Sequence, residues 1–159
     1  MNSHWPNIQN LHSVPSPGLL VDANRVSENL NAMIAMVAGD TSRLRPHVKT
    51  HKMPDVIRLQ VDAGITQFKT ATISEARMTA ESGGRDVLLA YQPVGPNVER
   101  LMQLIERFPN TTFATVADDP SVVSSLAAAH RASDGPLRVF IDVDCGMHRT
   151  GIPLGDAMD

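Results

Sequence analysis

Residues 45–52 read Arg45-Pro46-His47-Val48-Lys49-Thr50-His51-Lys52, and this stretch decides how the rest of the chain is interpreted. It holds two of the three lysines in a chain of 159 residues that also carries eleven arginines. If residues 44–50 form a strand, the two-residue period places Arg45, His47 and Lys49 on one face. Such a polar row belongs either to an edge strand whose basic face meets water or to a functional site.

A lysine at the end of a buried strand is suited to covalent chemistry. Burial strips water from the amine and favours its neutral form, which is the nucleophile that makes a Schiff base with a carbonyl. Lys49 would occupy this position. Composition and periodicity alone do not separate this reading from a solvated edge strand.

Three segments carry a resemblance to a known family. RPHVKTHK is similar to the pyridoxal-lysine segment of the D-threonine aldolase and D-serine dehydratase family, which is related to the alanine racemase barrel. SPGLLVD at residues 16–22 and DVDCGMHRTG at residues 142–151 resemble two further segments of that family, in the same order. In the family, the lysine after PH-x binds the aldehyde of pyridoxal 5'-phosphate (PLP), and the matching residue is Lys49.

The resemblance implies an activity. We expect a PLP-dependent lyase like D-threonine aldolase, which cleaves D-β-hydroxy amino acids to glycine and an aldehyde. D-Serine dehydratase-like activity, amino-acid racemization and a non-catalytic PLP-binding protein remain alternatives. The family also implies a small D-amino-acid substrate, a homodimer in the full-length form, and room for a divalent metal, manganese or zinc, with ligands outside this sequence.

Further site residues follow from the same resemblance. Arg149 lies in GMHRTG, similar to the stretch whose arginine approaches the phenolic oxygen of the cofactor, and a planar guanidinium suits that partner. A surface arginine is the alternative reading. His47 shares the predicted strand face with Lys49 and is expected near the cofactor ring. Asp142 stands where alanine racemases carry a carbamylated lysine, and its carboxylate would orient Arg149.

Two other polar residues receive weaker interpretations. His47 and His51 have a spacing seen in zinc sites on helices, but they flank a strand end and would not converge, so we expect no metal site in this sequence. Tyr91 is the only tyrosine. With Gln92 it falls at the C-terminal end of a predicted strand, where it could supply a catalytic phenol. We expect it instead to pack in the core with its hydroxyl satisfied.

Strand-like runs alternate with helical patterns along the whole chain. The runs span residues 44–50, 65–71, 86–92, 112–116 and 137–143, and a shorter run spans residues 19–21. Helices are expected to start near Asp22, Pro54, Ser74, Pro96 and Asp119-Pro120. Such a β/α repeat predicts an α/β fold with a parallel sheet, either open and doubly wound or part of a (β/α)₈ barrel. The family resemblance selects the TIM-type barrel.

The expected domain organisation is a lead-in segment at residues 1–15 followed by an incomplete PLP-binding, alanine racemase-like barrel domain at residues 16–159. About five β/α units are present, whereas a complete barrel takes about 250 residues. Five strands leave sheet edges open. We therefore expect the chain to be part of a longer protein, without the C-terminal β domain of the family.

Composition excludes several classes of function. The formal net charge of −3 and the pI near 6.0 give no general attraction to phosphate backbones, so nucleic-acid binding is not expected. No apolar run is long enough to span a membrane, and the N-terminus has neither the basic nor the apolar part of a secretory signal. With a single cysteine, Cys145, the chain fits a reducing compartment, and we expect a cytoplasmic protein.

Overall fold

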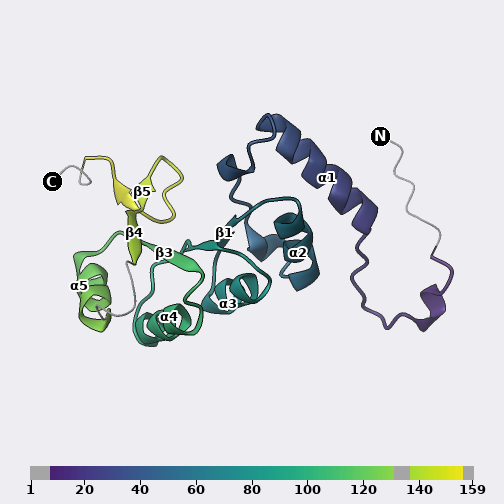
Figure 1. Ribbon diagram of the computed structural model, residues 1–159. Helices are drawn as coiled ribbons and strands as arrows, with labels where there is room; N and C mark the ends of the chain where they lie inside the picture. Colours follow the sequence, from purple (N-terminus) through teal and green to yellow (C-terminus); the bar gives the residue numbers. More distant parts are fainter. Residues whose placement is uncertain (1–7, 131–136, 156–159) are drawn as a thin grey trace.

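The structure is a computed structural model that describes residues 8–130 and 137–155. Helices and strands alternate along the described residues (Figure 1). The elements, in chain order, are the 3-10 helix η1 (Leu11–Ser13), α1 (Ala23–Met36), the 3-10 helices η2 (Thr41–Arg43) and η3 (Val48–Thr50), α2 (Pro54–Asp62), β1 (Gln67–Thr70), α3 (Ile73–Glu81), β2 (Asp86–Leu89), α4 (Pro96–Arg107), β3 (Thr112–Ala117), α5 (Pro120–Ala129), β4 (Arg138–Ile141), β5 (Val143–Asp144) and β6 (Ile152–Pro153).

The main sheet is parallel and follows the order of the chain. Its strands pair as β1-β2-β3-β4 without any reversal. A doubly wound sheet reverses its strand order at a switch point, whereas a barrel adds each new strand beside the previous one. Figure 1 shows α3, α4 and α5 along the same side of the sheet, as right-handed crossovers in a single winding direction require. The predicted α/β fold with barrel-like β/α units is therefore confirmed.

The helix starts agree with the signals in the sequence. Proline stands at the first turn of α2, α4 and α5, where its missing N–H costs nothing. The Asp22 carboxylate accepts hydrogen bonds from the backbone N–H groups of Asn24 and Arg25 and caps α1, as predicted. Thr72 caps α3 by accepting from the Glu75 backbone N–H.

The core lies between the sheet and these helices. Alternate strand residues point toward the helices and are buried, among them Phe68, Thr70, Val87 and Leu89. Burying each large apolar side chain stabilises the fold by about 1.5–3 kcal/mol. Within residues 8–130 and 137–155, no helix covers the opposite face of the sheet (Figure 1), so polar side chains on that face, such as Lys69, are available for a site.

Residues 44–50 do not form the predicted strand. Residues near His47 are extended and make one isolated parallel bridge, His47 to Lys69, in which the Lys69 backbone N–H donates to the Pro46 carbonyl at 2.9 Å. Pro46 has no N–H to extend a ladder. The His47 imidazole then accepts from the Lys49 backbone N–H and starts η3, so the segment turns where a strand would continue.

Two further sequence expectations are corrected. Residues 19–21 form no strand, because their apolar side chains are exposed and no neighbouring strand pairs with them. The run at 137–143 is interrupted at Asp142, where β4 ends and β5 turns away to pair with β6. Of the predicted lead-in at residues 1–15, positions 1–7 lie outside the described residues. Positions 8–15 include η1 and bury no side chain.

An ionic cluster joins strands that are not neighbours. The Asp86 carboxylate of β2 accepts from Arg45 at 2.7 Å and from Arg138 of β4 at 2.6 Å, so it bridges across β3. Desolvation tends to raise the pKa of Asp86, but the hydrogen bonds from Arg45 and Arg138 outweigh it, and the pKa of this carboxyl lies below its ordinary value. In the part of the chain that the structure describes, no helix is long and apolar enough to cross a membrane.

Candidate active site

A cavity of about 590 Å³ opens at the carboxyl edge of the sheet. Its lining comes from five successive segments of the chain, each of which follows or replaces a strand. These residues are His47 and Lys49; Lys69 and Ala71; Ala90, Tyr91, Gln92 and Val94; Val116 and Asp118; and Asp142, Arg149 and Thr150. Carboxyl ends of parallel strands are where α/β folds place their ligands, and the volume falls in the range of small-molecule sites.

Lys49 is presented by the one-turn helix η3. The neighbouring Val48 is completely buried in a cluster with Leu30, Ile57 and Phe68, and this contact anchors the turn. Lys49 points the other way, lines the cavity and is exposed. The expectation of a lysine dehydrated at a buried strand end is thus wrong for the described residues, because the lysine belongs to a surface turn.

His47 lies beside Lys49 at the same cavity. Burial lowers the pKa of the His47 imidazole, and the positive charges of Lys49 and Lys69 lower it further. Its Nδ1 accepts from the Lys49 backbone N–H at 3.3 Å. The neutral imidazole therefore carries its proton on Nε2 and adds no positive charge next to the two lysines.

Arg149 lies on a loop that is folded around Asp144. The Asp144 carboxylate accepts from the backbone N–H groups of Gly146 at 2.8 Å and His148 at 3.0 Å, and its second oxygen lies 2.8 Å from the His148 Nδ1. Hydrogen bonds from the His148 and Gly146 backbones hold the pKa of Asp144 below its ordinary value. The loop is thereby ordered while Arg149, exposed, faces the cavity.

Asp118 joins this loop to the sheet. Its Oδ2 accepts from the Gly151 backbone N–H at 3.0 Å, and its own backbone N–H donates to Gln92 Oε1 at 3.2 Å. Gly151 has a φ of +93°, and a Cβ there would lie 2.7 Å from the Asp144 nitrogen, so only glycine fits. The ends of β2 and β3 therefore fix the loop that carries Arg149.

The charges around the cavity suit an anionic ligand with a reactive carbonyl. Lys49, Lys69 and Arg149 supply three positive charges, and Asp118 and Asp142 supply two negative ones. The amine of Lys49 can act as a nucleophile toward an aldehyde, and the guanidinium of Arg149 can donate to an oxygen anion.

The sequence named some of these residues and missed others. Lys49, His47, Arg149 and Asp142 were singled out, and the structure brings all four to one cavity. The cavity also contains two residues for which no role was foreseen, Lys69 and Asp118. Their positions in the sequence could have identified them, since each lies at or just after the carboxyl end of a strand.

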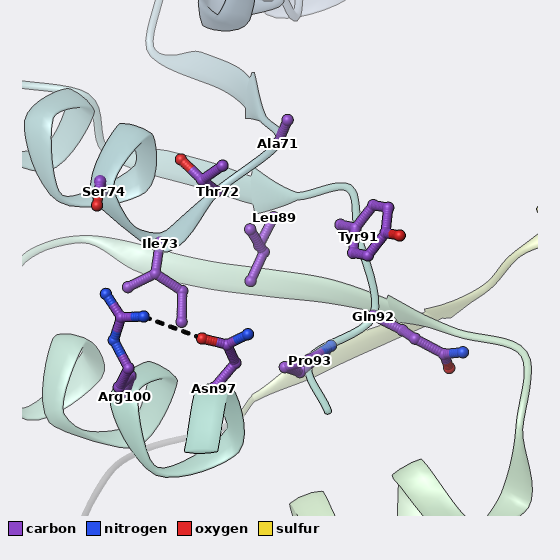
Figure 2. A pocket seen from close by; sticks show the side chains of 10 residues that line it. All are labelled: Ala71, Thr72, Ile73, Ser74, Leu89, Tyr91, Gln92, Pro93, Asn97 and Arg100. Carbon is purple, nitrogen blue, oxygen red and sulfur yellow. Dashed lines mark hydrogen bonds between the residues drawn. The ribbon is translucent and has the colours of Figure 1, made fainter. Parts of the chain in front are cut away.

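Tyr91 contradicts its expected role in the core, because 63% of its surface is exposed. It follows the last residues of β2 and stands between the cavity and a second one of about 600 Å³ beside α3 and α4. Figure 2 shows this second cavity with the Arg100–Asn97 hydrogen bond next to Ile73. Its lining contains neither a lysine nor a carboxylate, whereas the first cavity contains two lysines and two aspartates.

Comparison with known sequences gives an independent result. A family model described as "Alanine racemase, N-terminal domain" matches residues 21–159. Among curated proteins, the chain is 27% identical to D-threo-3-hydroxyaspartate dehydratase of Delftia sp. over 92% of this chain and 38% of the relative. It is 30% identical to 3-hydroxy-D-aspartate aldolase of Paracoccus denitrificans over 91% and 38%, and 28% identical to D-threonine aldolase of Arthrobacter sp. over 89% and 37%.

Solved structures agree with these sequence matches. The crystal structure of D-threonine aldolase from Filomicrobium marinum superposes with a TM-score of 0.78 at 28% identity, covering 89% of this chain and 38% of that one. The chain therefore spans little more than a third of the relatives and structures that it matches.

Proposed function

Because this chain belongs to the family of the alanine racemase N-terminal domain, we propose that its cavity is the cofactor site of a PLP-dependent lyase that resembles D-threonine aldolase. The observation that supports this most is the meeting of Lys49, His47 and Arg149 on one cavity at the carboxyl edge of the sheet. The proposed reaction cleaves a small D-β-hydroxy amino acid to glycine and an aldehyde.

The residues fit PLP. The cofactor carries an aldehyde, a phenolic oxygen and a phosphate, and the cavity offers an amine at Lys49, a guanidinium at Arg149 and a further cation at Lys69. Its volume suits a ligand of this size. When bound, PLP supplies an electron sink for charge that develops at the substrate's α-carbon.

Four residues that line the cavity would each have a role in holding the cofactor. The Lys49 Nζ would hold the cofactor through its aldehyde, and Arg149 would donate to the phenolic oxygen. Asp142 lines the same cavity, where a carboxylate can orient the guanidinium. His47 would lie near the cofactor ring, and its lowered pKa favours the neutral imidazole, which avoids repulsion with Lys49.

The reaction balances without an oxidant or a reductant. The bond between the α- and β-carbons breaks, the β-hydroxyl loses its proton to become the aldehyde, and the α-carbon gains a proton to give glycine. The described residues contain no group of three His, Cys, Asp or Glu side chains that could hold a metal. As the family resemblance implies, any manganese or zinc that engages the β-hydroxyl is proposed to have its ligands outside this sequence.

Dehydration is the second candidate, favoured by the similarity to the Delftia 3-hydroxyaspartate dehydratase. In that reaction, Lys49 takes the α-proton and the β-hydroxyl leaves, giving a keto acid and ammonia after hydrolysis. The same residues serve both candidates, because the choice of bond depends on how the substrate is oriented.

A product assay separates the candidates. The complete protein is incubated with PLP and D-threonine, and acetaldehyde is measured against 2-oxobutyrate. Acetaldehyde with an equal amount of glycine supports the aldolase, whereas 2-oxobutyrate moves the assignment to the dehydratase. Lys49→Ala should abolish either product, and Arg43→Ala, which removes an exposed cation away from the cavity, should not. Full activity in Lys49→Ala would refute the proposed role. Sedimentation of the same protein tests the proposed homodimer.

A further inference from the structure

The second lysine of RPHVKTHK has no place in the cavity. Lys52 does not line it, and its Nζ lies 3.3 Å from Glu75 Oε1. The two partners differ in burial, since the side chain of Lys52 is 64% exposed and that of Glu75 only 5%. A carboxylate buried to this degree is retained only where its charge is compensated.

Glu75 uses both of its carboxylate oxygens. Oε1 faces Lys52, and Oε2 accepts from the backbone N–H of Ala71 at 2.8 Å. Ala71 directly follows β1 and lines the cavity. The backbone of Glu75 is fixed in turn, because its N–H donates to Thr72 Oγ1 at 3.1 Å in the first turn of α3. One side chain therefore connects the end of β1 with the segment after Lys49.

Lys52 also closes the turn that carries Lys49. The Val48 carbonyl accepts from the backbone N–H groups of His51 at 3.2 Å and Lys52 at 2.9 Å. Lys52 reaches this geometry with a φ of 51°, in the left-handed region that a residue with a Cβ seldom adopts. The ion pair with Glu75 is a contact outside the turn that favours this conformation.

We propose that Glu75 is a positioning residue that, through Lys52 and Ala71, holds the Lys49 amine over the carboxyl edge of the sheet. The proposal rests on the proposed function, because it concerns the lysine assigned to the cofactor. It explains why a second lysine follows Lys49 at a spacing of three residues: Lys52 provides the charge that fixes the turn, and the carbon chain of Lys49 is left free to reach into the cavity.

The first test measures how well the turn that carries Lys49 is ordered in the complete protein without cofactor. Amide hydrogen exchange is followed at residues 48–52 and at Ala71. Glu75→Ala should speed exchange at both places by about tenfold, because it removes a charged hydrogen-bond acceptor. Glu75→Gln keeps an acceptor for Ala71 but loses the charge, so it should speed exchange mainly at residues 48–52. Glu99→Gln, at the matching first turn of α4, is the control and should change neither.

The second test measures capture of the cofactor. The complete protein is mixed with PLP, trapped with borohydride at intervals, and digested to find the labelled lysine. Glu75→Ala and Lys52→Met should slow labelling of Lys49 by about tenfold, while Lys52→Arg should restore it to within about twofold. Equal labelling rates in all variants, together with unchanged exchange at residues 48–52, would overturn the positioning role. Lys52→Met changes an exposed side chain and is expected to fold. It removes the same ion pair, so the positioning role can still be tested if Glu75→Ala fails to fold.

The two proposals fail in different ways. If the unaltered protein never labels Lys49, the assignment of the cofactor lysine is wrong, and the exchange data still decide whether Glu75 holds the turn. If the unaltered protein labels Lys49 and the Glu75 variants match it in both tests, only the positioning role is lost.

Discussion

Replacing Asp118 with alanine should loosen the loop that carries Arg149. The Oδ2 of Asp118 accepts a single hydrogen bond from the Gly151 backbone N–H at 3.0 Å, and Asp118 is half-buried. A hydrogen bond to a charged group contributes about 1.5–3 kcal/mol, and partial exposure reduces this to about 1–2 kcal/mol. Since about 1.4 kcal/mol corresponds to tenfold, the Gly151 amide should exchange about five- to thirtyfold faster.

The assay is amide hydrogen exchange on the complete protein without cofactor, read in peptides that cover residues 143–155. Asp118→Asn keeps an oxygen acceptor but loses the charge, so exchange at Gly151 should be only about two- to fivefold faster than in the unaltered protein. Asp119→Ala is the matched control, because the neighbouring carboxylate accepts from the Ser121 N–H at 2.7 Å and serves α5 instead. Unchanged exchange at Gly151 in Asp118→Ala, or an equal increase in Asp119→Ala, would refute the reasoning.

Three further outcomes are expected. Gly151→Ala should disorder the loop around Asp144 and weaken cofactor binding in a spectroscopic titration, since its Cβ would lie 2.7 Å from backbone atoms at a φ of +93°. Val48→Ala removes two buried methyl groups beneath Lys49 and should cost about 2 kcal/mol, measured by urea unfolding of the complete protein, whereas Val123→Ala on an exposed surface should cost less than about 0.5 kcal/mol. Because the pKa of Asp86 is depressed in the folded state, its contribution to stability is present above the ordinary pKa of 3.8 and is lost as pH falls through the folded value. Asp86→Asn should therefore lower the melting temperature at pH 7 and flatten its acid dependence, and an unchanged acid dependence would contradict the ion pairs.

Local signals in the sequence predicted the helices well. Proline at the first turn and a capping aspartate act within a few residues, so Asp22, Pro96 and Pro120 mark helix starts whatever the tertiary context. The β/α repeat was also visible, and it left the open sheet and the barrel as alternatives. The strand order, which is a long-range property, decides between them in the structure.

The sequence was less informative for short polar segments that can form either a strand or a turn. Alternation around His47 suggested a strand, but a histidine side chain that captures a backbone N–H and a proline without one favour a turn. Tyr91 was correctly placed at the carboxyl end of a strand, but its side chain was expected to pack in the core, and its position just beyond β2 exposes it at the rim of the cavity. Neither outcome follows from periodicity.

At the candidate site, too, residues with a local sequence signal were predicted, and residues that act through distant contacts were not. The resemblance of two motifs singled out Lys49 and Arg149, because their chemistry depends on residue type and local spacing. Asp118 and Glu75 act through contacts to Gly151 and Lys52 that lie 33 and 23 positions away along the chain. Contacts between residues so far apart in the sequence can be identified only from the folded structure.

The most direct measurement of the central claim is identification of the lysine that binds PLP. The complete protein is loaded with PLP, reduced with borohydride, digested and analysed by mass spectrometry. The 159 residues of this chain include three lysines, Lys49, Lys52 and Lys69, whose peptides are compared. The structure predicts a cofactor-sized mass increase on the peptide that contains Lys49, lost in Lys49→Ala. A stable label on Lys52 or Lys69 instead, or no label on any of the three, would contradict the account.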